Sequence, residues 1–350
     1  MPALTRAVAA GTPPHRRDRG GRRPASSLDA HVPPPPFPAL LDAALHGDRG
    51  ALARAVTRVE ADAPGAADEL ARRGVRRRTG PGAPHVVGLT GPPGAGKSTF
   101  TDQLVARARA DGERVAVIAV DPSSPRSGGA ILGDRIRMER HTEDPNVYLR
   151  SLASRGHLGG LGRATGAVVD LLDVVGFDRI LVETVGVGQG ELAVLEVADT
   201  VVVVLTPESG DTVQTMKAGL LEIADVFVVN KADRPGADLL RRELELSVEL
   251  DRREGLALGA SRWSAPVHLA VATAGQGVDE VFRTVAGHLA WCRADGATDW
   301  ARRRAEGRVA EWLDRVAERA RADALAAGRA DGTLERLRAG LVRPDELVSR

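Results

Sequence analysis

A glycine-rich segment of the type that binds phosphate stands at residues 91–99. Its members are Gly91, Pro92, Pro93, Gly94, Ala95, Gly96, Lys97, Ser98 and Thr99. The segment follows an apolar run and precedes a helical pattern, which is the context that such a loop requires. Glycines let backbone N–H groups approach an anion closely, and the N-terminus of the helix adds a partial positive charge. Because Lys97 can reach the β- and γ-phosphates and the Ser98 hydroxyl can ligate Mg²⁺, the segment predicts a nucleoside triphosphate site.

A second motif indicates which base is read. Asn230, Lys231 and Asp233 stand at the end of the apolar run that begins at Val226. The Asp233 carboxylate can accept hydrogen bonds from the ring N–H and the exocyclic amine of guanine, neither of which adenine offers. Asn230 can bond another edge of the base and steady the loop, and the Lys231 stem can lie over the ring. Downstream of a phosphate loop, this motif favours GTP.

Acidic residues between the two motifs are candidates for handling Mg²⁺. Glu183 ends a strand pattern and can hold the ion through water, while the Gly186 N–H can sense the γ-phosphate, so this segment is expected to move on hydrolysis. Asp121 and Asp134 flank a segment rich in Gly and Pro, and both are candidate Mg²⁺ or water-positioning groups. Taken alone, these two acids are more simply explained as solvated turn residues.

The composition draws attention to the lysines of the two motifs and argues against several classes of protein. Lysine occurs only at Lys97, Lys217 and Lys231, so all but three of the 48 basic residues are arginine. The formal net charge of +1 argues against a nucleic-acid binder. No apolar run approaches the ~18 residues of a membrane span. A single cysteine, Cys292, excludes a disulfide framework and favours the cytoplasm. An organelle matrix stays open, because the first residues are rich in arginine.

Strand and helix patterns alternate from residue 85 onward. Strands are expected at residues 86–90, 114–120, 146–149, 179–183, 200–206, 226–230 and 267–271. Helices are expected at residues 97–110, 165–175 and 239–254. This alternation predicts an α/β fold of the P-loop NTPase type, with a mainly parallel sheet covered by helices on both faces.

The domain organisation follows from shifts in composition. Residues 1–38 are rich in Pro, Arg and Gly and are expected to be disordered. Residues 39–80 form a helical extension, 81–292 the nucleotide-binding domain, and 293–350 a helical arm. An apolar stripe on that arm needs a partner, which is either the body of the domain or another subunit. The stripe consists of Val309, Trp312, Leu313, Val316 and Ala320.

Four runs together resemble one known family, the GTPases associated with methylmalonyl-CoA mutase. They are 121–138, 183–189, 207–217 and 230–233. This MeaB/ArgK family includes the human methylmalonic aciduria type A protein. The similarity covers residues 39–292 and is most specific over 85–235. It implies the P-loop fold that signal-recognition and nickel-insertion GTPases share.

The resemblance implies a role for each matching residue. Lys97 and Ser98 contact phosphate and Mg²⁺, and Asn230, Lys231 and Asp233 read guanine. The first switch contains Asp121 and Asp134, the second contains Glu183, and the third contains Asp211 and Lys217, which relay the nucleotide state to the mutase.

The last guanine loop departs from the family pattern of Ser-Ala before Gly-x-Gly. Here Val271 and Ala272 precede Gly275-Gln276-Gly277, so a hydroxyl is missing. The Ala272 N–H can still meet the base oxygen. We therefore expect a slightly altered affinity with the specificity retained.

The combined prediction is a slow regulatory GTPase. Val187 follows Gly186 where some small GTPases have a water-orienting glutamine, and Gln189 lies two residues further on. Hydrolysis is therefore expected to accelerate when a partner orders the switches. The resemblance implies that this partner is an adenosylcobalamin-dependent acyl-CoA mutase, whose cofactor loading is gated and which is protected or reactivated. It adds a cobalamin adenosyltransferase as a second candidate partner and a homodimer as the assembly.

Four alternatives remain open to different degrees. A nickel-insertion GTPase needs metal ligands, yet there is one Cys and the eight His residues form no cluster. A protein-targeting GTPase needs a Met-rich domain, and there are three Met. A kinase for amino-acid transport proteins would transfer phosphate to protein. A GTP-binding module without turnover would bind the nucleotide only.

Overall fold

The computed structural model describes residues 35–74, 82–122, 140–154, 160–184, 197–209, 223–257 and 263–294, with short stretches between 325 and 339. All helices and strands named below lie within Pro36–Arg350. Helix α1 (Phe37–Leu45) begins two residues before Ala39, where the helical extension was expected to start. Phe37 is buried in the core, and Pro38 fits the first turn of the helix, where its missing N–H costs nothing.

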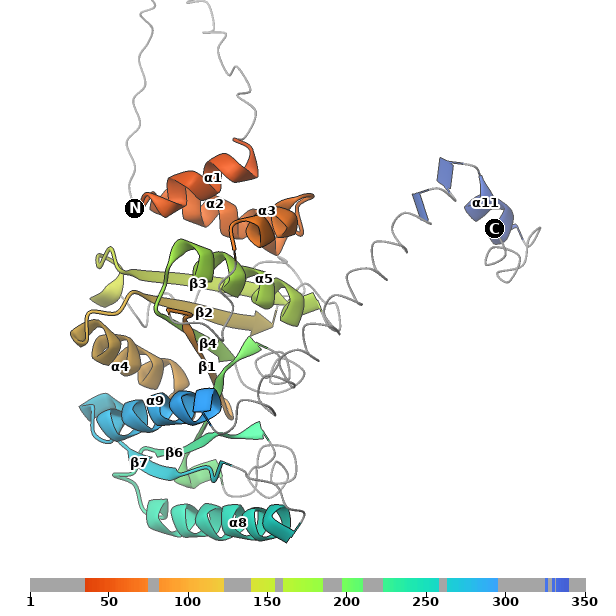
Figure 1. Cartoon of the computed structure of the whole chain (residues 1–350). Coiled ribbons are helices and arrows are strands. Elements are labelled where there is room, and N and C mark those ends of the chain that lie inside the picture. Colours follow the sequence, from red (N-terminus) through yellow and green to blue (C-terminus); the bar gives the residue numbers. More distant parts are fainter. Residues whose placement is uncertain are drawn as a thin grey trace, which may run out of the picture. The chain divides into compact units, whose positions relative to one another are not determined.

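Seven parallel strands form one sheet in the order β3-β2-β4-β1-β5-β6-β7 (Figure 1). The strands are β1 (His85–Thr90), β2 (Val115–Pro122), β3 (Val147–Ser154), β4 (Arg179–Thr184), β5 (Thr200–Leu205), β6 (Val226–Asn230) and β7 (Val267–Ala270). Every residue of β1, β4, β5 and β6 is buried, as expected for strands covered on both faces. The predicted fold class is confirmed.

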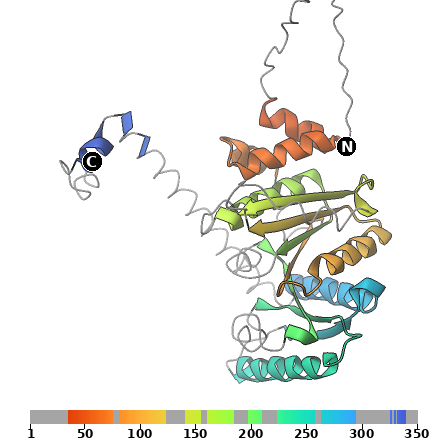
Figure 2. The ribbon, with the colours of Figure 1, turned by 180° about the vertical axis from the view of Figure 1, so that it is seen from behind.

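Helices cover both faces of the sheet (Figures 1 and 2). Alternate residues of β5 show the division, since Val202 and Val204 pack with α4 (Lys97–Ala110) and α9 (Val278–Ala294). On the other face, Val201 and Val203 pack with α8 (Ala237–Ala257). That face also carries α5 (Gly160–Val175), which shares one core with α1, α2 (Arg49–Glu60) and α3 (Ala66–Arg72). In the described part of the chain, the other helices are the short turns η2 (Pro207–Ser209) and η3 (Ala272–Ala274), and α11 (Thr333–Arg338).

Strand β3 is longer than its sequence pattern indicated. The expected strand ended at Leu149, but β3 continues to Ser154 and pairs with β2 along its whole length. Arg150 has partners at the edge of the sheet, because its Nη2 donates to Thr57 Oγ1 at 3.0 Å and to Glu60 Oε2 at 3.1 Å. Arg150 therefore lies within the strand and ties it to α2.

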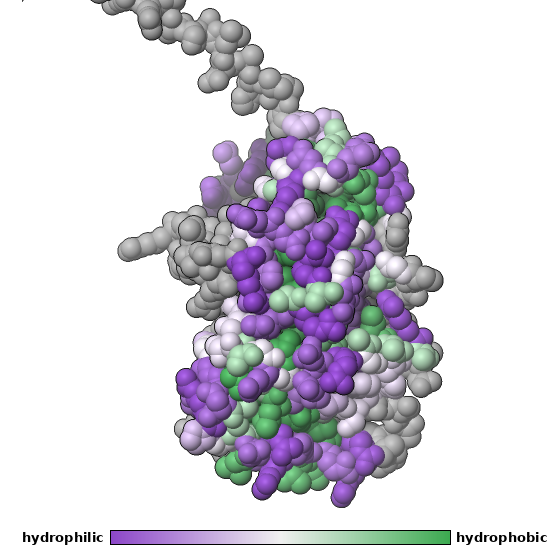
Figure 3. Space-filling model, turned by 90° about the vertical axis from the view of Figure 1, so that its left-hand side faces the viewer, coloured by the Kyte–Doolittle hydropathy of each residue, from purple (hydrophilic) through white to green (hydrophobic). Residues whose placement is uncertain are grey.

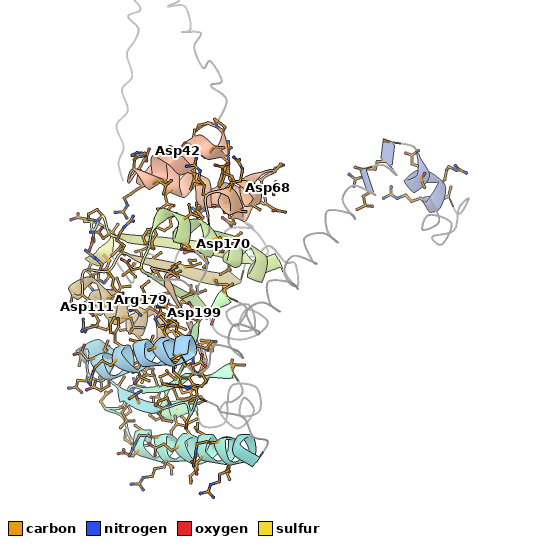
Figure 4. The ribbon with its side chains drawn as sticks, viewed as in Figure 1. Asp42, Asp68, Asp111, Asp170, Arg179 and Asp199 are labelled. Atoms are coloured by element: carbon orange, nitrogen blue, oxygen red, sulfur yellow. The ribbon has the colours of Figure 1, made fainter. Side chains whose placement is uncertain are left out.

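A row of buried polar side chains runs across the amino ends of the strands. Thr200 Oγ1 lies 2.9 Å from His85 Nε2 and 2.9 Å from His288 Nδ1. Arg179 lies 3.2 Å from His85 Nδ1 through Nη1 and forms a two-pronged ion pair with Glu113. Figure 4 shows Arg179 at this end of the sheet. The row joins β1, β4, β5 and α9 at the end of the sheet away from the loop at 91–96.

Substituting Thr200→Val is expected to lower the free energy of unfolding by about 2–3 kcal/mol, because two buried histidine nitrogens lose a hydrogen-bond partner. Valine has nearly the same volume and suits a strand, so packing should change little. Urea unfolding measures the effect, with Ser247→Ala in α8 as the control, because the Ser247 hydroxyl is exposed and donates to the Glu243 carbonyl oxygen of its own helix. An unfolding midpoint equal to that of the wild type would show that the row contributes nothing.

Within the described residues, no helix is both long and apolar enough to cross a membrane. Figure 3 shows one face of the molecule, on which hydrophilic side chains predominate and apolar side chains form scattered patches.

Candidate functional site

The carboxyl ends of the strands form the candidate site. β1 pairs with β4 on one side and with β5 on the other, so later strands are added to the sheet on both sides of this central strand. Ligands of open α/β sheets bind in the crevice at such a switch point. The predicted phosphate loop follows β1 directly and therefore lies at that position.

Glycines give this loop its conformation. The Gly91 φ of +137° places the backbone against β5, and a Cβ there would lie 2.0 Å from the carbonyl oxygen of Val204. Gly96, with a φ of +85°, is the N-cap of α4, and no side chain caps this end of the helix. By contrast, α2 is capped by Asp48, whose carboxylate accepts from the Ala51 N–H at 2.9 Å. The N-terminus of α4 therefore offers its N–H groups to an external anion.

Lys97 is folded into the loop. Its ammonium donates to the carbonyl oxygens of Gly91 at 2.8 Å and Pro92 at 3.0 Å, and the residue is only 6% exposed. The positive charge is thus held beside the N-terminus of α4. Glycine backbone, an uncapped helix and a buried ammonium together fit the phosphates of a nucleotide.

Ser98 and Glu183 form the part of the site that fits Mg²⁺. The Ser98 hydroxyl donates to Glu183 Oε1 at 2.5 Å, and Glu183, at the end of β4, is 3% exposed. Mg²⁺ prefers oxygen ligands and usually takes one or two from the protein, with phosphates and water completing its shell. A hydroxyl and a carboxylate side by side meet this requirement. Among the described side chains, no group of three or more His, Cys, Asp or Glu is arranged to hold a metal ion.

Asn230 joins the two predicted motifs. Its Nδ2 donates to the Ala95 carbonyl oxygen at 2.8 Å, and its Oδ1 accepts from the Ala272 N–H at 3.0 Å. A Cβ at Gly96 would lie 2.5 Å from this Nδ2, so the close contact requires glycine. The side chain therefore steadies the loops, as predicted, and it already engages the Ala272 N–H that the sequence assigned to the base oxygen.

The remaining guanine-loop residues stand at the surface. Lys231 has a φ of +56°, which turns the chain sharply after β6, and Asp233 is exposed. Glu208 pairs with Arg234 and lies 3.8 Å from the Lys231 ammonium. Arg234 is the main cause of the lowered pKa of Glu208, and Lys231 adds to it. Glu208 belongs to the run that resembles the third switch. Its contact with Lys231 and Arg234 was not predicted, because no sequence pattern around Glu208 indicates these partners.

Several predicted residues cannot be placed. Gly186, Gln189, Asp134, Asp211 and Lys217 lie outside the described residues. Asp121 is described only as part of the backbone of β2, where it pairs with Ala153 of β3. Among the placed residues, the structure brings together the loop at 91–99, Glu183, Asn230 and Ala272.

Comparison with known proteins decides the family. The model of the methylmalonyl-CoA mutase-associated GTPase MeaB matches residues 52–329. The chain belongs to this family. A protein from Pyrococcus horikoshii named as a GTPase is 48% identical over 263 residues, which are 75% of this chain and 80% of that protein. The predicted membership in the MeaB family is confirmed.

Two other relatives are named after methylmalonic aciduria and after an acyl-CoA mutase. The mitochondrial methylmalonic aciduria type A homolog of Mus musculus is 41% identical over 57% of this chain and 48% of its own length. The fused isobutyryl-CoA mutase of Cupriavidus metallidurans is 39% identical over 62% of this chain, but the match spans only 20% of that protein. Among solved structures, one described as LAO/AO transport system kinase superimposes with a TM-score of 0.62 at 25% identity, covering 89% of this chain and 95% of that one.

Proposed function

We propose that this MeaB-family GTPase binds GTP with Mg²⁺, hydrolyses it slowly, and regulates an adenosylcobalamin-dependent acyl-CoA mutase. The observation that carries the nucleotide part is the Asn230 side chain. Asn230 begins the guanine motif, and its side chain bonds Ala95 of the phosphate loop and Ala272 of the last guanine loop. A phosphate-binding loop tied in this way to a base-reading loop suits a single ligand that contains both groups.

The roles of the residues follow from their positions. Lys97 and the N–H groups at the start of α4 bind and orient the phosphates, so that charge developing on them is stabilised. Ser98 and Glu183, with Asp121 and Asp134 as further candidates, hold Mg²⁺, which neutralises phosphate charge when bound. Asp233 and Lys231 select guanine. We assign the sensing of the γ-phosphate to the Gly186 N–H.

Slow intrinsic turnover is proposed because Val187 occupies the position after Gly186 and has no polar group to orient water. Gln189 is the candidate that a partner would bring into place. Phosphoryl transfer depends mostly on positioning, so ordering one residue can change the rate by orders of magnitude.

A mutase partner is supported by the fused isobutyryl-CoA mutase, which contains a segment similar to this chain within its own length. We propose that the bound nucleotide biases the switches between two states with different affinity for the mutase. Gating of cofactor loading and reactivation would be the consequences, with a cobalamin adenosyltransferase as a second partner. Residues 293–350 are proposed as a dimerisation arm.

The experiment that tests this proposal compares binding of the purified chain to an adenosylcobalamin-dependent methylmalonyl-CoA mutase in two nucleotide states. Calorimetry with a non-hydrolysable GTP analogue and with GDP should give affinities that differ by about tenfold. An acyl-CoA thioesterase that uses no cobalamin serves as the control protein. Equal affinity in both states, or no binding in either, would contradict the regulatory part.

Lys217 provides a test of the third switch. We expect Lys217→Arg to keep GTP binding and to lose most of the mutase-stimulated hydrolysis, because the broad guanidinium fork replaces a compact point charge. The measurement is phosphate release with and without mutase. Unchanged stimulation would remove Lys217 from the coupling.

A further inference from the structure

The carboxylate of Glu183 is held by two hydroxyl groups from helix α4, and only one of them belongs to the phosphate-loop motif. Ser98 donates to Oε1 at 2.5 Å, and the Thr101 hydroxyl lies 3.0 Å from Oε2. Residues three apart on a helix lie on the same face, so α4 presents both hydroxyls to the end of β4. The two carboxylate oxygens are thus distinguished, with one facing each hydroxyl.

Thr101 has one proton and two acceptors within reach. Its Oγ1 lies 3.0 Å from the Lys97 carbonyl oxygen and 3.0 Å from Glu183 Oε2. A carboxylate accepts a hydrogen bond more strongly than a neutral carbonyl does, so the proton is assigned to Glu183. Thr101 is fully buried and Glu183 is 3% exposed, so water does not compete effectively for this contact.

A hydrogen bond that fixes the carboxylate matters more for a glutamate than for an aspartate. The additional methylene of glutamate adds a rotatable bond, and fixing a glutamate side chain costs about 1.5–2 kcal/mol of conformational entropy. With Oε2 held by Thr101, Oε1 stays on Ser98 before any metal arrives. We propose that Thr101 is a positioning residue that prepares the Ser98–Glu183 pair for Mg²⁺. This inference rests on the proposed binding of guanine nucleotide and Mg²⁺.

The test measures Mg²⁺ affinity apart from turnover. Release of a fluorescent GDP analogue is followed while Mg²⁺ is titrated, and again in EDTA. Thr101→Val removes the hydroxyl and keeps the volume. We expect it to raise the Mg²⁺ concentration that half-suppresses release by about tenfold, the size of one hydrogen bond to a charged group, and to leave GDP affinity in EDTA unchanged.

Three comparisons separate positioning from general damage. Thr101→Ser keeps the hydroxyl and should stay within about twofold of the wild type, since it retains the hydrogen bond. Ser247→Ala is the control, because the exposed Ser247 hydroxyl also donates to a carbonyl oxygen one turn back, that of Glu243 at 2.9 Å, in the middle of α8 and away from Glu183. In a Glu183→Gln background, Thr101→Val should add little, as expected for residues acting as a unit.

The inference is overturned if Thr101→Val leaves the Mg²⁺ midpoint unchanged, if it weakens GDP binding equally in EDTA, or if Thr101→Ser behaves like Thr101→Val. Should Thr101→Val fail to fold, Thr101→Ala and Thr101→Ser provide the same comparison. A wild type that binds no GDP at all would refute the proposed function itself, which is a different result from GDP binding that Thr101 does not influence.

Discussion

Replacing Asp233 with asparagine is expected to lower the affinity for GTP by at least about 1,000-fold and to create affinity for xanthosine triphosphate. A carboxylate accepts hydrogen bonds from the ring N–H and the amine of guanine, whereas the asparagine amide presents a donor toward that amine. Xanthine has a carbonyl in place of the amine and therefore suits the new side chain. The structure supports a direct role, because Asp233 is exposed in the loop that Asn230 ties to the phosphate loop.

Competition between GTP, ATP and xanthosine triphosphate for a fluorescent GDP analogue measures the change. Asp238→Asn is the matched control, since Asp238 is an exposed aspartate in the first turn of the adjacent helix α8. It should leave all three affinities as in the wild type. GTP binding at wild-type strength in Asp233→Asn would mean that the base is read elsewhere.

The second large effect is expected at Lys97. Lys97→Ala removes the ammonium that is held against Gly91 and Pro92, and with it the point charge of the phosphate loop. Truncating one member of a buried, hydrogen-bonded charge pair costs about 2–5 kcal/mol, so GTP affinity should fall by at least about 30-fold. Hydrolysis should fall further, because charge grows on the phosphates in the transition state.

Arg107→Ala is the control for Lys97→Ala, because it removes a positive charge from the last turn of the same helix. Arg107 pairs with Asp111 and Asp279, away from the phosphate loop. Equilibrium binding and single-turnover hydrolysis are measured for both variants. If both lower the GTP affinity by the same factor, general electrostatics of α4 would explain the loss without a site at Lys97.

The sequence was sufficient for the elements whose signals are local. Helix α4 begins at Lys97 and ends at Ala110, as expected from the loop before it and Gly112 after it. Strand β6 also has its expected bounds, because four apolar residues, Val226 to Val229, lead directly into the guanine motif at Asn230. Strand β3 was cut short because Arg150 and Ser151 interrupt its apolar pattern, and their compatibility with an edge strand depends on α2, far earlier in the chain.

The candidate site could also be predicted from the sequence only in part. The motifs identified Lys97, Ser98, Glu183 and Asn230 as site residues, since each carries a known chemical requirement at a fixed spacing. Their partners were not predictable, because Thr101 meets Glu183 across 82 residues of sequence and Asn230 meets Ala95 across 135. Such contacts are created by the parallel order of the strands, which no single motif encodes.

Two of the three lysines are now placed in the fold. Lys97 lies in the phosphate loop, and Lys231 follows Asn230 with its ammonium near Glu208. Two of the three rare lysines therefore lie in the two motifs of the candidate site. For Lys217, the same pattern supports the proposed role in the third switch.

The most direct test of the central claim is single-turnover hydrolysis of GTP labelled in the γ-phosphate, with and without an adenosylcobalamin-dependent mutase. We predict that the label appears as inorganic phosphate, slowly for the chain alone and at least about tenfold faster with the mutase. Label transferred to protein would instead support a kinase, the activity named for the LAO/AO transport structure. No release under either condition, or the same rate in both, would contradict a GTPase regulated by the mutase.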